Sequence, residues 1–418
     1  MNDLFIAVRS GRVNGLRGSC GVKLTSNAVA WSIRAFIVAL GCCRPAVADE
    51  PLRVTLLGQS LIKVDLRTAA PYSVEQARSY LPRDSVVFTN LEVAVASPDV
   101  AVEKRNPAVP HVGPEVLDSL RELGINLVAL SNNHALDLGV PGLLATIDEV
   151  TARGMVPAGA GRDLDSALAP GVLQRPEGRY ALVGIASGGV QLVPQTWAGP
   201  QRAGVNFLEL RADGSLNPEQ HQRIIQTIRA AAKDADLVIV YHHNHYWGPA
   251  VSAPGPPFRE PRSQRFETPE WMRSFAREVV DAGAGMYVVH GNPALHGIEI
   301  YKGKPLFYGL GNYIFHAASH PDRFGPLAFQ SAAVQVEYAT PDKLREIRIT
   351  PLLLTLEHSE HGPRGTPYLA ASGDADAILQ RIVQMSRVYG TEVLLAGEQG
   401  VIRIKDEDIG RDVEREEH

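Results

Sequence analysis

The sequence predicts an α/β protein, in which strands and helices alternate along most of the chain. Three observations support this fold class. Short apolar runs recur along the sequence, and such runs are typical of buried strands. Segments whose apolar residues have helical spacing separate these runs. A histidine, asparagine or glutamate follows several of the runs, and an open α/β sheet carries such residues at the carboxyl ends of its strands.

The elements expected in the first half of the chain fit this alternation. Pro114 stands at a helix start, where proline is tolerated, and Gly154 suits the residue that closes a helix. We expect strands at 52–58, 85–89 and 125–130, and helices at 74–81, 114–123 and 140–153.

The second half of the chain continues the pattern. The clearest amphipathic helix is expected at 218–233. A stretch rich in proline and glycine at 248–264 predicts a long irregular loop, and such loops often carry function. We expect strands at 180–186, 237–241, 285–289, 304–310 and 346–354, and helices at 268–282 and 374–388, followed by a loose charged tail at 405–418.

Composition and charge limit the class of protein. The chain has 418 residues, 45% of them hydrophobic, and can bury one large or two modest cores. The net charge is −5, and residues 1–48 hold six basic residues against one acidic residue, so the remaining chain is more acidic still. An acidic body without a run of lysine or arginine argues against a nucleic acid as the main partner.

The cysteines exclude several kinds of site. All three, Cys20, Cys42 and Cys43, lie within the first 48 residues. The remaining chain therefore has no disulfide, no zinc–thiolate site and no catalytic thiol. Any metal there must be bound by imidazole, carboxylate, amide or water.

Residues 27–48 have the pattern of a secretory signal. An apolar core at 35–40 precedes Ala46-Val47-Ala48, a small-residue cleavage signature, and the core is too short to span a bilayer. We therefore expect an exported protein that is periplasmic or associated with the cell envelope. Two alternatives stay open: a lipid or membrane anchor, indicated by Cys42, and a disordered N-terminus without export.

Polar side chains gather where the expected strands end. Asn132-Asn133-His134 follows the apolar run at 125–130. Such positions meet at one edge of an open α/β sheet, and oxygen and nitrogen donors suit a divalent metal. The other polar residues after or close to an apolar run are Glu92, His243, His245, His290 and His296.

Five segments in a fixed order carry a resemblance. They are Asn90-Leu91-Glu92, residues 131–137, Gly159-Ala160-Gly161-Arg162, residues 297–304 and residues 310–315. In this order they resemble the bacterial capsule synthesis protein CapA family, over about residues 52–353. The resemblance implies a four-layer metallophosphoesterase-like sandwich of the calcineurin type, with two mixed β-sheets flanked by helices. It also implies a role in capsule or poly-γ-glutamate biosynthesis, beside membrane-bound polymer synthesis proteins.

The resemblance also implies boundaries and a site. We expect a targeting segment at 1–48, a CapA-like domain at 49–355, and a C-terminal helix with a charged tail at 356–418. One or two divalent ions of manganese, zinc or iron are implied, with His134 as the group that contacts or protonates the phosphate. The implied metal ligands are Glu92, Asn133, His243 and His290, and the further candidate ligands are Gln59, His245 and His296.

Each of these residues also has a simpler interpretation. Glu92 could cap a helix or pair with an arginine, Asn133 could stabilise a turn, and His134 could be a half-buried, hydrogen-bonded histidine. On an extended chain, His243 and His245 point to the same face of the strand.

Two positions depart from the pattern of the family. Gly58-Gln59 stands where the family has Gly-Asp, and a neutral amide binds hard cations more weakly than a carboxylate does. His290 and His296 are separated by five residues, whereas such phosphoesterases have two histidines flanking a single residue. Two alternatives stay open: a general phosphoesterase unrelated to capsule, and a non-catalytic binding or scaffold protein with the same fold, which these departures motivate.

The remaining candidates concern an anionic small-molecule or polymer substrate. Arg105 and His111 lie in a proline-rich loop, and Arg162 follows a small-residue turn that can expose backbone N–H groups to an anion. A tight turn with a surface arginine explains Arg162 equally well. The other candidates for substrate binding come from the family motifs: Asn90, Glu299 and Asn312.

Overall fold

The computed structural model describes residues 50–404, except 84, 99, 101–111, 189–196, 248–266 and 317–324. Several predictions lie outside the described residues. They are the targeting segment and its cysteines, Arg105, His111, the whole loop at 248–264, and the charged tail at 405–418. Within the described residues, no helix is long and apolar enough to cross a membrane.

One sheet has nine strands and mixes parallel with antiparallel pairs. Its order is β18-β19-β16-β15-β1-β3-β4-β5, with β17 beside β16. The strands β1, β3, β4 and β5 are parallel, and β15 joins β1 in the antiparallel direction. The bounds are β1 (Leu52–Leu56), β3 (Val86–Asn90), β4 (Leu127–Ala129), β5 (Val156–Ala158), β15 (Gln330–Thr340), β16 (Lys343–Leu354), β17 (Pro367–Leu369), β18 (Leu394–Ala396) and β19 (Gln399–Arg403).

The second sheet has six strands in the order β12-β13-β11-β10-β8-β7. Its central strands β8, β10, β11 and β13 are parallel, and an antiparallel strand closes each edge. The bounds are β7 (Gly171–Arg175), β8 (Gly178–Ser187), β10 (Leu237–Asn244), β11 (Met286–His290), β12 (Ile298–Tyr301) and β13 (Lys304–Phe307). Two small pairs lie apart from these sheets: β2 (Gln59–Leu61) with β14 (Asn312–Phe315), and β6 (Ala160–Gly161) with β9 (Gly204–Val205).

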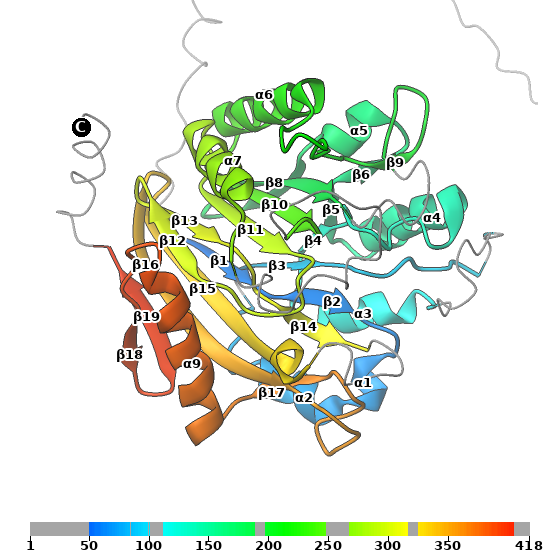
Figure 1. The fold of residues 1–418 in the computed structure, drawn as a ribbon. Helices are drawn as coiled ribbons and strands as arrows, with labels where there is room; N and C mark the ends of the chain where they lie inside the picture. The colour runs from blue at the N-terminus through cyan, green and yellow to red at the C-terminus, as the bar shows by residue number, and fades with distance from the viewer. Residues whose placement is uncertain are drawn as a thin grey trace, which may run out of the picture. The chain divides into compact units, whose positions relative to one another are not determined.

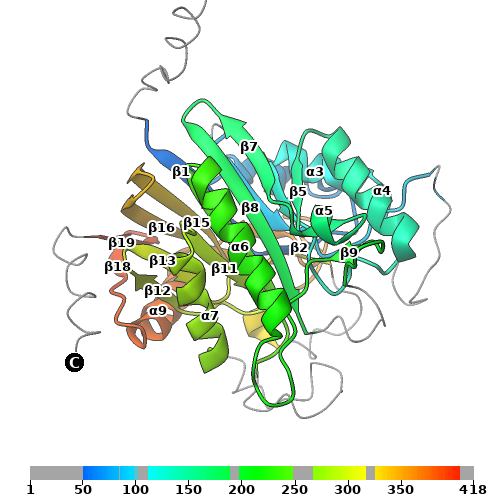
Figure 2. The same cartoon turned by 90° about the horizontal axis from the view of Figure 1, so that it is seen from above.

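The two large sheets pack face to face, with helices on both outer faces. One apolar core joins the inner faces of the sheets, for example Phe88 of β3 with Tyr241 of β10. A second core packs α1 (Leu66–Ala69), α2 (Pro71–Ala77) and α3 (Glu115–Glu122) on the nine-stranded sheet. A third packs α6 (Pro218–Asp234) and α7 (Glu270–Asp281) on the six-stranded sheet. Figure 1 shows these two helix groups on opposite sides, and Figure 2 shows α6 over β8.

This arrangement confirms the predicted α/β sandwich of two mixed sheets flanked by helices. The other helical segments are α4 (Gly139–Ala152), α5 (Leu164–Leu168), α9 (Ser372–Arg387) and η3 (Pro326–Phe329).

Some predicted bounds were wrong. The helix expected at 74–81 begins at Pro71 and ends at Ala77, because Pro71 stands in its first turn. The strand expected at 304–310 ends at Phe307, and the chain then turns toward Asn312.

Candidate functional site

Strands of both sheets end at one edge, and this edge carries the predicted polar residues. Glu92 lies two residues beyond β3, and Asn133 and His134 lie in the turn after β4. His243 is near the end of β10, and His290 is the last residue of β11. His243 and His290 stand in register on these parallel neighbours. The edge is thus formed by carboxyl ends of strands, where open α/β sheets place their sites.

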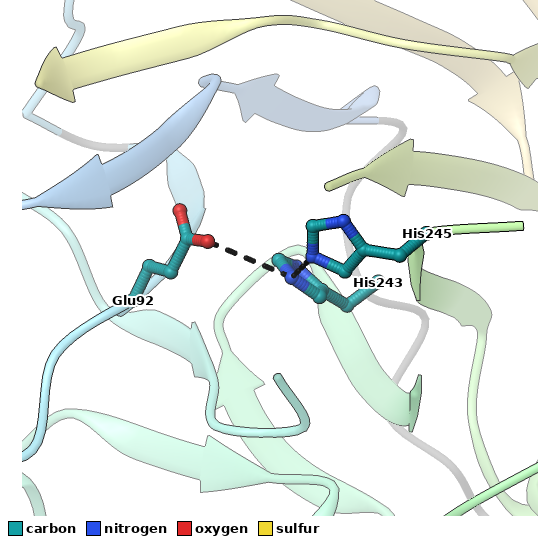
Figure 3. Close-up of side chains that lie close together, drawn as sticks. All are labelled: Glu92, His243 and His245. Carbon is teal, nitrogen blue, oxygen red and sulfur yellow. Dashed lines mark hydrogen bonds and ion pairs between the residues drawn. The ribbon is translucent and has the colours of Figure 1, made fainter. Parts of the chain in front are cut away.

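A carboxylate and two imidazoles form a compact cluster at this edge. Ligand atoms of Glu92, His243 and His245 all lie within 4.8 Å of one another. The Nε2 atom of His243 is 3.6 Å from Oε1 of Glu92 and 3.0 Å from Nε2 of His245. Figure 3 shows the three side chains pointing toward one another. The side-chain oxygen of Asn133 also lies 2.8 Å from Nε2 of His243. Three potential ligand atoms therefore surround Nε2 of His243, which is itself the fourth.

The orientation of His243 suits a metal ligand. Its Nδ1 atom lies 3.0 Å from the hydroxyl oxygen of Tyr241, which precedes it by two residues on the same face of β10. In the tautomer in which Nδ1–H donates to this oxygen, the lone pair of Nε2 is free for a cation. Tyr241 thus fixes the ring with Nε2 toward the cluster.

Burial determines the charge state of the cluster. Burial raises the pKa of Glu92 to about 7, because the carboxylate loses its hydration. Burial also lowers the pKa of His243 well below its usual value, and the surrounding imidazoles lower it further. Oε2 of Glu92 has no hydrogen-bond partner within the described residues. A cation would supply a positive counter-charge to this buried carboxylate. Neutral imidazoles keep a lone pair that can bind the cation.

His290 lies beside the cluster but does not belong to it. The ring is fully buried against Phe88 and Tyr241, and burial lowers its pKa to about 3. The Leu57 carbonyl favours the protonated ring slightly, yet neither ring nitrogen forms a hydrogen bond of normal geometry to a described residue. His290 is therefore a neutral, buried imidazole whose nitrogens form no hydrogen bond of normal geometry within the described residues.

Gln59 is held by the protein on both sides of its amide. Its Nε2–H donates to Oδ1 of Asn312 at 2.9 Å, and its Oε1 accepts from the backbone N–H of Gly291 at 3.0 Å. Asn312 in turn donates to the carbonyls of Pro293 and Ala328. These two predicted site residues link β2, β14 and the loop after β11 through hydrogen bonds within the protein.

The turn after β4 fixes His134 by two contacts. Its backbone N–H donates to the side chain of Asn132 at 3.0 Å, and its Nδ1 lies 2.6 Å from Oδ2 of Asp137. Burial opposes protonation, but the hydrogen bond and charge of Asp137, with the charge of Glu92, outweigh it and raise the pKa of His134. The His134 side chain keeps 32% of its surface exposed. Sequence reasoning missed Asp137, although a carboxylate three residues after a histidine was a usable signal.

Asn90 supports this turn from the neighbouring strand. Its Oδ1 accepts from the Asn132 amide at 3.0 Å, and the same amide donates to the Leu91 carbonyl. The Nδ2 atom of Asn90 is buried without a partner within the described residues.

Three predicted residues lie apart from the cluster. His296 contacts the Asn292 amide at 2.9 Å and packs on Trp247. Glu299 is buried, and its carboxylate accepts from two arginines of α7 and from Tyr308. Arg162 is exposed and lies 3.3 Å from Asp148. The structure does not bring these residues to the Glu92–His243–His245 cluster.

Two mixed sheets flanked by helices, with a polar cluster where their strands end, define an α/β sandwich. The family model described as "Bacterial capsule synthesis protein PGA_cap" matches residues 53–317, which is more than half of the chain. The chain therefore belongs to this family, and the predicted resemblance is confirmed.

Several bacterial proteins are similar in sequence to this chain. An uncharacterized protein of Sinorhizobium fredii is 25% identical, over 76% of this chain and 86% of its own length. A probable polyglutamine synthesis accessory protein of Mycobacterium tuberculosis is 30% identical over 55% of each chain. The PGA biosynthesis protein CapA of Bacillus subtilis is 27% identical over 56% of each chain. A phosphatase structure from Mycoplasma pneumoniae aligns with 73% of this chain and 94% of its own, at 13% identity and a TM-score of 0.43.

Proposed function

We propose that this chain is an exported, metal-dependent phosphoesterase-like enzyme of cell-surface polymer biosynthesis. The observation that carries the proposal is the convergence of Glu92, His245 and Asn133 on Nε2 of His243. A carboxylate, an amide oxygen and two imidazoles form a ligand set that suits manganese, zinc or iron. The unpartnered Oε2 of Glu92 supports the fit, because a buried carboxylate needs a cation or a donor.

We propose a single ion at this centre. A second ion would need an acidic ligand near His290, and the nearest predicted ligand, Gln59, is neutral and already bound by Asn312 and Gly291. A divalent ion supplies positive charge to a phosphate oxygen and lowers the pKa of a water. His134 holds a proton that can pass to the leaving oxygen, and Asp137 fixes the ring for this step.

The biological role in this proposal rests on the family and on the names of its members. Relatives are named for capsule biosynthesis and for polyglutamate or polyglutamine synthesis. We propose an anionic substrate, either a small phosphate ester or a polymer, and membrane-bound polymer synthesis proteins as partners. Export is proposed on the sequence pattern of residues 27–48.

The test is turnover of a panel of phosphomonoesters and phosphodiesters by the full chain, purified without chelator. We expect hydrolysis that chelation abolishes and that manganese, zinc or iron restores. His243→Ala and His134→Ala should each lower kcat/KM at least about a hundredfold, as loss of a metal ligand or a proton donor does. His221→Ala is the matched control, because His221 pairs with Glu278 between α6 and α7, away from the cluster.

Two outcomes would contradict the proposal in different ways. Stoichiometric metal without turnover on any ester would contradict catalysis and favour a metal-stabilised binding or scaffold protein. Turnover that survives both chelation and His243→Ala would contradict the metal centre itself.

A further inference from the structure

A second group of polar side chains lies where β2 and β14 end. Lys63 follows β2 by two residues, and His316 is the first residue after β14. The backbone N–H of Lys63 donates to Nδ1 of His316 at 3.1 Å, and the His316 N–H donates to the Leu61 carbonyl at 2.9 Å. This pair of hydrogen bonds fixes the two residues beside each other.

The hydrogen bond to Nδ1 determines where His316 carries its proton. A neutral imidazole that accepts at Nδ1 has its hydrogen on Nε2. Nε2 of His316 is buried and has no partner within the part of the chain that the structure describes. A buried N–H group without an acceptor is unfavourable, and native proteins rarely leave one. Among the described residues this N–H thus has no acceptor, and it could donate to a bound anion.

Lys63 brings a positive charge that acts on His316. Its side chain is half-buried, and burial lowers its pKa. No carboxylate within the described residues forms an ion pair with its ammonium group. Asp65, two residues away, is already bound by Arg67 and by the Ser119 hydroxyl. Within the described residues, a cation that acts on the His316 ring and a buried N–H donor of that ring thus both lack an anionic partner.

These two residues lie close to the candidate metal centre. The Ser60 carbonyl accepts from the Glu92 N–H at 3.0 Å, so β2 runs beside the Glu92 segment. Lys63 is three residues further along, a reach of about 10 Å on an extended chain. The charge of Lys63 also acts on both His134 and His316, favouring the neutral form of each ring. An anionic group could therefore reach Lys63 from a substrate held near His134.

We propose that Lys63 and His316 bind an anionic group of the substrate, a carboxylate or a phosphate, beside the candidate metal centre. The lysine supplies charge, and the Nε2–H of His316 supplies a directed hydrogen bond. This proposal rests on the proposed function, which places the substrate near His134. The binding itself belongs to these two side chains and does not require a metal.

The test measures anion binding calorimetrically, with inorganic phosphate and glutarate as separate probes. The full chain is used both metal-loaded and after chelation. Lys63→Met keeps the apolar stem, and His316→Asn keeps an acceptor near the Nδ1 position while it removes the Nε2–H donor. Lys233→Met and His221→Asn are the controls, since Lys233 is exposed on α6 and His221 pairs with Glu278.

We expect Lys63→Met to weaken binding about tenfold or more and His316→Asn about threefold to tenfold, with both controls unchanged. The probe that loses more affinity in Lys63→Met identifies phosphate or carboxylate as the preferred group. Lys63→Met should leave Tm unchanged or raised, because it removes an unpaired, half-buried charge. If the parent bound no metal but kept Lys63-dependent anion binding, the metal centre would fail and the subsite would stand.

Two results would overturn the subsite. One is equal anion affinity of Lys63→Met and the parent, in both metal-loaded and chelated protein. The other is a marked fall in Tm that accompanies the loss of binding in Lys63→Met, because this would show that Lys63 has a structural role.

Discussion

Gln59 lies buried between two chain segments, and both ends of its amide are hydrogen-bonded. An aspartate at this position would be shorter and acceptor-only, and it would meet the Oδ1 atom of Asn312 rather than a donor. The preceding residue must be a glycine because the two segments lie so close together. A Cβ added to Gly58 would lie 2.6 Å from the backbone carbonyl carbon of Asn312. Gln59 is thus a neutral link between β2 and β14.

Gln59→Ala should destabilise the fold by about 2–4 kcal/mol, because it leaves two buried polar groups without partners. These groups are the Gly291 N–H and the Asn312 Oδ1. Urea unfolding measures the change, and Gln222→Ala on the exposed face of α6 is the control, expected within about 0.5 kcal/mol. Equal stability of Gln59→Ala and the parent would contradict the linking role.

For individual residues, the sequence predicted which side chains lie near one another but not which of them are in contact. Glu92, Asn133 and His243 were expected together, and the alternation along a strand already placed His243 and His245 on one face. His290 was ranked above His245 as a ligand, whereas the compact cluster contains His245. Whether His290 or His245 joins the cluster depends on the directions of side chains beyond the strand ends, and periodicity does not determine these directions.

Among the contacts between helices and strands, the Glu299 carboxylate joins α7 to the edge of the six-stranded sheet. Arg273 and Arg277, one helical turn apart on α7, both donate to it, and Tyr308 donates from the loop after β13. The carboxylate is only 3% exposed. The family motif made Glu299 a candidate for substrate binding, whereas its contacts hold a helix to the edge of a sheet.

Glu299→Gln should destabilise the protein by about 2 kcal/mol, since it leaves two part-buried arginines facing a neutral group. The arginines keep 30% and 40% of their side-chain surface exposed, so the loss is smaller than for a fully buried pair. Thermal unfolding compared with Glu219→Gln, an exposed pair on α6, tests this. A loss no greater than that of the control would show that the contacts add nothing.

The sequence analysis missed β15 for a physical reason. The run from Gln330 to Thr340 forms β15, which lies between β1 and β16 in the nine-stranded sheet. Its valines at 334 and 336 alternate with Gln335 and Glu337, a pattern of antiparallel strands with one exposed face. A search for continuous apolar runs detects parallel strands that are buried on both faces. It misses strands in which apolar and polar residues alternate.

At the scale of the whole molecule, the candidate ligands come from both sheets. Glu92 follows β3 of the nine-stranded sheet. His243 lies on β10 of the six-stranded sheet, and His245 is the first residue after β10. A metal at this point would therefore connect the two halves of the sandwich. The four layers themselves were expected only through the family resemblance, because periodicity predicts elements and not their stacking.

Metal binding should consequently stabilise the entire sandwich. At a free metal concentration about a hundred times Kd, linkage adds about 2.7 kcal/mol to the free energy of unfolding. We expect chelation to lower Tm by a few degrees and added manganese or zinc to restore it. Glu92→Gln should abolish the shift, while Glu219→Gln should keep it. A metal-independent Tm in the parent would contradict a cross-link between the sheets.

The most direct test of the central claim is anomalous X-ray diffraction from crystals loaded with manganese or zinc. The account predicts one anomalous peak per chain, bound by Glu92, His243 and His245, with Asn133 beside it. No peak at this position would contradict the metal centre. A second peak beside Gln59 and His290 would contradict the single-ion site.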